Sequence, residues 1–243
     1  MSEHRFESRQ AALRQGVRDA MGAPVLVLFT GMIGFGAMCR ANNLDVWFAT
    51  ATSFLMFALP GQVVMLEMII TGSSLLAIGL AVSLTSTRFI TMAVTLFPQL
   101  HEKDRNPKLF ASVHMMAMTA WAVSMREFAH MAPQYRLSYF LGLAFPCWLI
   151  SVPGTALGYV IAGQVSAPVT LGLLFINPLF FLLTFTEVKP WANRLAILVG
   201  CLLGPMFYTL DRDTSLLTTG LVAGSFAYWV DKRFIRRVRG VSA

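Results

Sequence analysis

Charged residues are scarce in this chain, and their scarcity sets its class. Only 13% of the 243 residues are Asp, Glu, Lys or Arg, whereas 56% are hydrophobic. A soluble domain carries about twice that charged fraction. The charges also gather in short clusters between long apolar blocks, which is typical of a multi-pass membrane protein embedded in lipid. We therefore expect a single membrane domain at residues 22–231, preceded by a segment at 1–21 and followed by a basic tail at 232–243.

Cysteine is rare, and the usual catalytic motifs are missing. The three cysteines lie far apart with no CxxC or Cys/His spacing, so the sequence predicts no disulfide framework, no metal site and no other cofactor. No GxxxxGK[ST] motif occurs, so we expect no nucleotide hydrolysis. His114 and His130 have no carboxylate at metal-binding spacing. These absences argue against a membrane enzyme.

The net charge of +7 comes largely from the two ends of the chain. Basic clusters beside membrane spans stay on the cytoplasmic side and attract anionic lipid headgroups, so we expect both termini to be cytoplasmic. The same distribution argues against nucleic-acid binding, which needs a solvated basic face. About twenty polar residues precede the first apolar run, which predicts a short amphipathic cytoplasmic helix and not a cleavable signal. The N-terminal basic residues are Arg5, Arg9, Arg14 and Arg18, and five more lie in the tail.

The apolar blocks predict an all-α bundle, because each is near the roughly 20 residues that a helix needs to cross a bilayer. They do not alternate in polarity as barrel strands do. Two cytoplasmic termini require an even number of crossings. The loop at 101–108 would then face outward although it carries three basic residues, so seven spans with one re-entrant segment remain an alternative. The predicted spans are 22–39, 46–70, 74–98, 108–126, 137–162, 168–186, 194–210 and 214–231.

Small residues recur at four-residue spacing in three places. In lipid, such spacing lets helix backbones approach closely and gain packing contacts. We interpret it as tight packing within the bundle, with a homo-oligomer contact as the alternative. The residues are Gly154, Gly158 and Ala162, then Gly200 and Gly204, and then Gly220 and Gly224.

The stretch FALPGQVVMLE at 57–67 interrupts an apolar run that is long enough to cross the membrane. Pro60 removes a backbone donor and Gly61 permits non-helical angles, so we expect a broken second span there. A break is tolerated only where protein or a wet cavity supplies hydrogen-bond partners, and transporters use such breaks to hold substrates. Gln62 adds an amide at the same point. A simple packing kink is the alternative. Glu67 is a candidate for proton movement, with a structural role equally open.

Arg88 lies near the centre of the third predicted span, after a run of serine and threonine residues. A guanidinium at that depth costs about 2.5–3.5 kcal/mol on insertion scales, so it should face the interior and have a partner. If spans two and three form a hairpin, Arg88 and Glu67 differ in depth by more than about 10 Å. We therefore expect Arg88 to meet the broken backbone near Gln62. A substrate carboxylate and a purely structural tie to carbonyl groups are both open.

Three further features are weaker candidates. His114 could relay a proton, because a histidine side chain exchanges protons near neutral pH, although it could equally be a satisfied bundle residue. Asn177–Pro178 and Pro153–Gly154 echo the Pro-Gly break in the second half of the chain. Breaks in both halves are typical of transporters built from inverted repeats.

Several of these motifs, in their order and spacing, resemble the AzlC family. Pro24 with GMIGFGA at 31–37, SFLMFALPGQ at 53–62, and Ser86–Arg88 followed by LFPQL carry the resemblance in the first half. PCWLISVPGTALGYVIA at 146–162 and LGLLFINPLFF at 171–181 carry it in the second. The resemblance covers roughly residues 15–230.

The resemblance implies an inner-membrane permease that exports branched-chain or other small neutral amino acids, driven by protons and assisted by a small AzlD-type membrane subunit. The family's small-residue-Gly-Gln motif falls on Ala58–Gln62, and its Asn-x-Arg-His motif falls on Ser86–Phe89. Ser86 and Phe89 depart from the expected Asn and His, and acidic residues expected at 118–123 and 171–175 are missing. Either the substrate differs or coupling uses other residues.

The prediction is therefore a secondary transporter that works by alternating access around a site near the membrane midplane. The lost polar residues leave a non-transporting scaffold or regulatory subunit as the alternative. The predicted substrate-binding residues are Ser53, Pro60, Gly61, Gln62, Ser86, Arg88 and Asn177, and the proton-coupling candidates are Glu67 and His114.

Overall fold

The computed structural model describes residues 6–105, 109–166, 168–173, 175, 179 and 191–235, and the secondary structure in these residues is helical. The chain divides into two compact units. Unit 1 comprises residues 1–63 and 85–178, and unit 2 comprises residues 64–84 and 179–243. The boundaries between the units fall inside helices α4 (Leu59–Ile70) and α5 (Leu75–Leu96). The predicted all-α class is confirmed.

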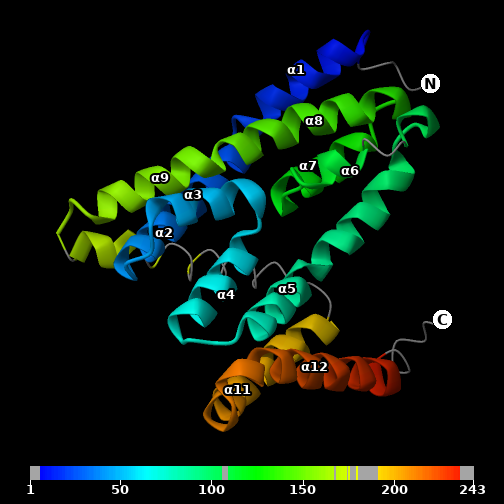
Figure 1. The fold of residues 1–243 in the computed structure, drawn as a ribbon. Coiled ribbons are helices and arrows are strands. Elements are labelled where there is room, and N and C mark those ends of the chain that lie inside the picture. Colours follow the sequence, from blue (N-terminus) through cyan, green and yellow to red (C-terminus); the bar gives the residue numbers. More distant parts are fainter. Residues whose placement is uncertain are drawn as a thin grey trace. The chain divides into compact units, whose positions relative to one another are not determined.

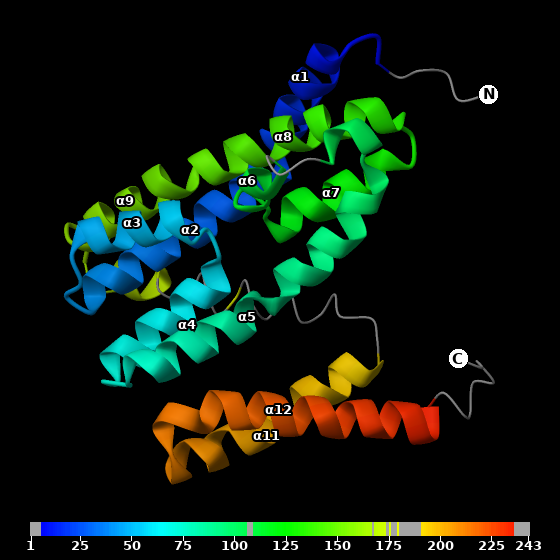
Figure 2. The same ribbon diagram turned by 45° about the vertical axis from the view of Figure 1, so that its right-hand side comes forward.

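Unit 1 is built along one long helical axis. Helix α8 (Pro133–Leu149) and helix α9 (Ser151–Ala162) are interrupted only at Ile150 and form a 30-residue apolar rod. Helix α1 (Arg9–Ala20) packs along α8, and helix α2 (Ala23–Ala41) packs along α9, as Figures 1 and 2 show. Helices α2 and α9 are parallel, because Phe29 lies beside Gly154 while Arg40 lies beside Gly163. Helices α1 and α8 are parallel too, because Phe6, just before α1, lies beside Tyr135 while Gly16 lies beside Leu143.

Glycines bring these helices into backbone contact. A Cβ atom on Gly36 would collide with the carbonyl oxygen of Thr155, and one on Gly158 would collide with that of Ile33. Gly16 and Gly142 stand in the same relation to α8 and α1. The structure thus confirms that Gly154 and Gly158 serve packing inside the bundle, as the four-residue spacing predicts. Gly220 and Gly224 have open space around them.

A matched pair of substitutions tests this packing. Gly158→Ala should lower thermal stability in detergent, because the new methyl group meets the backbone of Ile33 and overpacking costs about 1–3 kcal/mol. Gly79→Ala makes the same change in α5, where no atom lies within 4 Å. It should leave stability unchanged or raise it by up to about 1 kcal/mol through helix propensity. Equal melting shifts for the two variants would contradict the close α2–α9 contact.

The N-terminal segment forms a helix, as predicted, and this helix is docked. Ser8 caps α1 by accepting a hydrogen bond from the backbone N–H of Ala11 at 3.1 Å. Ala12, Gly16 and Ala20 are buried, and they form the face that lies against α8. The exposed residues between them include Arg14 and Arg18. The helix is therefore amphipathic: its small residues face α8, and its arginines face away from it.

One end of unit 1 gathers the start of α1, the start of α8 and the loop after α5. Arg9 pairs with Asp104 at 3.1 Å, and the rings of Phe6 and Tyr135 lie 6.3 Å apart. The expectation that the loop at 101–108 faces the side opposite the N-terminus is therefore wrong. Because this loop lies beside the start of α1, its basic residues no longer conflict with the positive-inside rule.

The predicted span at 108–126 is not a single crossing helix. It consists of α6 (Leu109–Val113) and α7 (Met118–Phe128), separated by residues 114–117. Arg136 joins its two flanks, because its guanidinium donates to the carbonyl oxygens of Gln99 at 2.7 Å and Met131 at 2.9 Å. The segment therefore enters and leaves at the same end of α8. This is the re-entrant arrangement that the seven-span alternative allows.

Four helical stretches in the described residues are long and apolar enough to cross a membrane: Ala23–Ala41, Leu75–Gln99, Pro133–Ala162 and Trp191–Leu210. They match the predictions at 22–39, 74–98, 137–162 and 194–210. The predicted span at 46–70 is divided into α3 (Val46–Leu55) and α4. The prediction at 168–186 lies mostly outside the described residues. Helix α12 (Arg212–Val230) covers the prediction at 214–231, but it is not among the four stretches.

Unit 2 contains two helical hairpins. Met68, Ala77, Ile78 and Ala81 form a small core where α4 turns into α5. Helix α11 (Trp191–Leu210) packs against α12. A Cβ atom placed on Gly200 would lie 3.9 Å from the side chains of both Thr219 and Ala223. A short π-helical turn, Asp231–Ile235, follows α12.

Candidate functional site

The broken second span is present, but the break lies earlier than predicted. Helix α3 ends at Leu55 and α4 begins at Leu59, so residues 56–58 form the interruption. Phe57 takes the left-handed conformation with φ of 43°, which is costly for a residue with a bulky side chain. Pro60 lies in the first turn of α4, where its missing N–H needs no partner. Pro60 and Gly61 therefore start the second helix, and Phe57 makes the turn.

The carbonyl groups freed by the break find side-chain partners from other helices. The carbonyl oxygen of Phe54 accepts from His114 Nε2 at 2.9 Å and from Trp148 Nε1 at 3.1 Å. Ser151 Oγ donates to the carbonyl oxygen of Ser53 at 3.3 Å. In an unbroken helix these two carbonyls would accept from backbone N–H groups four residues on. The broken segment is thus held by protein groups, as a break within lipid requires.

Two interrupted segments therefore meet beside the α8–α9 junction. Helix α3 comes from the end of unit 1 where Arg40 stacks on Tyr159, and the α6–α7 segment comes from the opposite end, where Arg136 lies. Their turning points touch through Phe54 and His114, next to Trp148. Trp148 and Ile150 are near the middle of the 30-residue rod. The contact is consequently close to mid-span.

A chain of buried hydroxyl groups runs from Gln62 into the bundle. Gln62 Nε2 donates to Ser53 Oγ at 3.0 Å, and Ser53 Oγ lies 2.7 Å from Thr155 Oγ1. Each of the two hydroxyl groups also has a carbonyl acceptor on its own helix: Ser53 Oγ lies 3.1 Å from the carbonyl oxygen of Ala49, and Thr155 Oγ1 lies 2.9 Å from that of Ser151. All five residues are fully buried. Buried polar groups are retained only when they are hydrogen-bonded, and this chain satisfies nearly all of them.

One atom in this series of buried polar groups has no hydrogen-bond partner among the described residues. Gln62 Oε1 is buried and accepts no hydrogen bond from the described residues. A buried acceptor without a donor costs about 1–3 kcal/mol, so it is an unusual feature of a well-packed interior. An ammonium or hydroxyl group of a bound solute would satisfy it.

Gly61 and Ser86 lie close together, which joins two of the predicted site residues. The position that a Cβ atom would occupy on Gly61 is 4.0 Å from Ser86 Oγ. Arg88, two residues on, is half-buried, and its Nε is buried without a hydrogen-bond partner among the described residues. Its guanidinium lies 5.1 Å from the centre of the Phe89 ring. The structure records no hydrogen bond between Arg88 and the break near Gln62.

The remaining candidates have different surroundings. Glu67 is exposed on α4 and has no ion pair with the residues that the structure describes. His114 holds the broken segment in place through its hydrogen bond to the carbonyl oxygen of Phe54. Pro153 and Gly154 do not break α9, because Gly154 donates its N–H to Ile150 and packs on Phe29. That expected echo is wrong. Asn177 and Pro178 lie outside the described residues.

Sequence reasoning missed Thr155, Ser151 and Trp148 as partners of the break. Ser151 and Thr155 are four residues apart and so share a helix face, which is a weak signal by itself because hydroxyl residues are common in membrane helices. The sequence offers no indication that this face meets Ser53.

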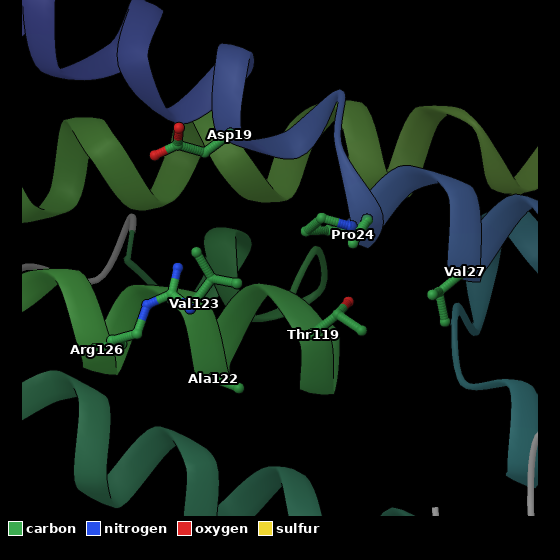
Figure 3. A pocket seen from close by; sticks show the side chains of 8 residues that line it. Asp19, Pro24, Val27, Thr119, Ala122, Val123 and Arg126 are labelled. Atoms are coloured by element: carbon green, nitrogen blue, oxygen red, sulfur yellow. The ribbon is translucent and has the colours of Figure 1, made fainter. Parts of the chain in front are cut away.

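A separate cavity of about 420 Å³ lies between the α1–α2 corner and α7 (Figure 3). One wall carries Asp19, and the opposite wall carries Arg126. Apolar side chains and Thr119 line the space between them. Within the described residues, no three His, Cys, Asp or Glu side chains are placed to hold a metal ion.

Comparison with known families gave one finding, the AzlC protein family, whose model matches residues 24–165. Comparisons with curated proteins and with solved structures gave no significant match. The AzlC family is associated with branched-chain amino-acid transport; its members are generally not enzymes, and they often pair with an AzlD protein. The matched region spans more than half of the chain and includes the break, the hydroxyl chain and the α8–α9 rod. This chain therefore belongs to the AzlC family.

Proposed function

We propose that this protein is a secondary transporter that exports branched-chain or other small neutral amino acids across the inner membrane. The observation that carries the proposal is Gln62 Oε1, which has no hydrogen-bond partner in the described part of the chain and lies at the end of a buried hydroxyl chain, beside a helix break. Such breaks near mid-span hold substrates in alternating-access transporters. The predicted substrate-binding residues Ser53, Pro60, Gly61, Gln62 and Ser86 all lie at or next to this break.

Arg88 and Asn177 complete the proposed substrate-binding set, with Arg88 taking the substrate carboxylate. We propose proton coupling through Glu67 or His114 and an arrangement with both termini in the cytoplasm. The family association with AzlD supports a small membrane partner. The α6–α7 segment returns to the side from which it enters, so it does not cross the membrane. With both termini in the cytoplasm, the number of crossings is even, so one more of the eight predicted spans does not cross either.

Substitution of Gln62 tests the site. Gln62→Met keeps the side-chain volume but removes the amide, so export of preloaded labelled amino acids should fall by roughly 2- to 12-fold, the equivalent of one neutral hydrogen bond. Efflux should be measured from cells with and without the small partner, and at equal membrane levels of each variant. Unchanged efflux by Gln62→Met would remove the amide from the substrate site.

A non-transporting scaffold is the second candidate, and the missing acidic residues at 118–123 favour it. The two functions differ in ligand binding. A transporter should show a rise in melting temperature with added leucine, because only a protein that binds the ligand in its folded state is stabilised by it. No shift with any neutral amino acid, together with no efflux, would favour the scaffold.

A further inference from the structure

The cavity beside α7 combines two opposite charges with an apolar wall. Its volume of about 420 Å³ falls within the roughly 300–1,000 Å³ usual for small-molecule sites. Its apolar side is formed by Pro24 and Val27 of α2 and by Ala122 and Val123 of α7. Figure 3 shows Asp19 above the space, on α1, and Arg126 below it, on α7.

Asp19 is fixed in place and keeps capacity for another donor. Its Oδ2 accepts from the Tyr139 hydroxyl at 2.6 Å, and its Oδ1 accepts from Gln15 Nε2 at 2.8 Å. A carboxylate has about four acceptor positions, so two remain for an ammonium group. Tyr139 is fully buried, which makes it a rigid support for the carboxylate.

Arg126 faces Asp19 with its terminal nitrogens available. Its side chain is 73% exposed, and its Nε donates to Glu127 Oε1 at 3.2 Å in an ion pair. Its other guanidinium nitrogens make no hydrogen bond within the described residues. A guanidinium offers a planar pair of donors that matches a carboxylate. The two walls of the cavity therefore present a site for a positive group and a site for a negative group.

The cavity extends along α7 toward the meeting point of the two interrupted segments. Thr119 lines its inner part and has a buried Oγ1 with no hydrogen-bond partner among the described residues. Thr119 lies in the first turn of α7, close in the chain to His114, whereas Arg126 lies about 10 Å further along α7, toward the end of unit 1 where Arg136 lies. The cavity thus extends from that end of unit 1 toward the meeting point of the two interrupted segments.

We propose that this cavity is the cytoplasmic entry site for a zwitterionic amino acid with a small apolar side chain. Asp19 binds the ammonium group, Arg126 binds the carboxylate, and Pro24, Val27 and Val123 contact the side chain. The proposal rests on the transport function proposed above and adds a site to it. The end that carries Arg126 also carries Arg9 and Arg136, which makes it the cytoplasmic end by the positive-inside rule.

The test is uptake of labelled leucine by energised inside-out membrane vesicles, in which the cytoplasmic face is outermost. Asp19→Asn and Arg126→Gln should each raise the KM for leucine about tenfold or more, because each removes a hydrogen bond to a charged group. The maximal rate should change little, since neither residue belongs to the central site. Unchanged KM values in both variants, with normal wild-type uptake, would overturn the entry site and leave the transport function intact. Absence of wild-type uptake of any neutral amino acid would overturn both.

Matched controls separate binding from support. Tyr139→Phe removes the hydroxyl that orients Asp19 but keeps the carboxylate, and Arg18→Gln removes an exposed charge on the same helix. Tyr139→Phe should raise the KM much less than Asp19→Asn does, because the carboxylate that binds the ammonium group remains. Arg18→Gln should leave the KM within about twofold of wild type, because an exposed charge is worth little. A Tyr139→Phe effect as large as that of Asp19→Asn would mean that Asp19 acts only as a structural partner, and would overturn the proposal.

Competing ligands test the assignment of each charge. In wild-type vesicles 4-methylpentanoate, which lacks the ammonium group, and isopentylamine, which lacks the carboxylate, should both compete more weakly than unlabelled leucine. Asp19→Asn should remove the advantage of leucine over 4-methylpentanoate, and Arg126→Gln should remove its advantage over isopentylamine. The reverse pattern, or no change in either ratio, would contradict the assigned orientation.

Discussion

Replacing Arg88 by methionine should abolish amino-acid efflux while leaving insertion into the membrane intact. Arg88 lies in the middle of α5, its Nε is buried, and no described residue accepts a hydrogen bond from that atom. A guanidinium within a membrane span is costly, about 2.5–3.5 kcal/mol on insertion scales, so its removal does not prevent insertion. Because we propose that Arg88 binds the substrate carboxylate, its removal should cost more than one neutral hydrogen bond, and the loss of efflux should exceed that of Gln62→Met.

Two companion variants make the Arg88 result specific. Arg88→Lys keeps a positive charge but loses the planar pair of donors, so it should retain partial efflux. Ile90→Ala changes an exposed apolar residue on the same helix and should have no effect. Membrane levels and thermal stability are measured beside efflux. Normal efflux by Arg88→Met at a normal membrane level would exclude Arg88 from the substrate site.

The sequence was sufficient for the class of fold because composition and block length follow directly from the bilayer. Apolar stretches of about 20 residues predict spanning helices, and α2, α5, the α8–α9 rod and α11 match them closely. The glycine spacing at 154 and 158 predicted a packing face for a similar reason, since only close helix contact selects for small residues there.

The sequence predicted the existence of the break correctly but not its position. Pro60 and Gly61 indicated an interrupted helix, but proline also occurs commonly in the first turn of a helix, which is where Pro60 lies. The turn was made instead by Phe57, whose positive φ no sequence rule predicts for a bulky residue. The interruption at 114–117 carries no proline or glycine at all. Its position depends on tertiary contacts with Phe54 and Trp148, which a pass along the chain does not reveal.

The same limit applies to the site. Gln62 was identified by its unusual place in an apolar run. Its hydrogen-bond partner Ser53 lies on α3, and the partner of Ser53, Thr155, lies on α9. The cavity was missed because Asp19 falls in the segment at 1–21, which the sequence places outside the membrane, and Arg126 falls at the end of the predicted span at 108–126. Water normally reaches residues outside the membrane and at the ends of spans, so a charged residue there is not unusual. Only the structure shows that these two charges line the same cavity.

The contact between the two turning points should be cooperative, and a double-mutant cycle measures this. His114→Phe and Trp148→Phe each remove one of the two donors to the Phe54 carbonyl and keep an aromatic ring in place. Each single variant should lose about 0.5–1.5 kcal/mol of stability, because one donor remains. The double variant leaves the carbonyl without either donor near mid-span, where an unsatisfied group costs several kcal/mol. Its loss should therefore exceed the sum of the single losses by more than about 1 kcal/mol.

A control cycle shows that the effect belongs to this carbonyl. Trp121→Phe also removes an indole donor, but from the hydroxyl of Thr95, 3.1 Å away. It should combine additively with His114→Phe, within about 0.5 kcal/mol, because the two variants share no acceptor. Additive losses for His114→Phe with Trp148→Phe would instead mean that water replaces the missing donors. The break would then be solvated, and the two interrupted segments would not depend on one another for their shape.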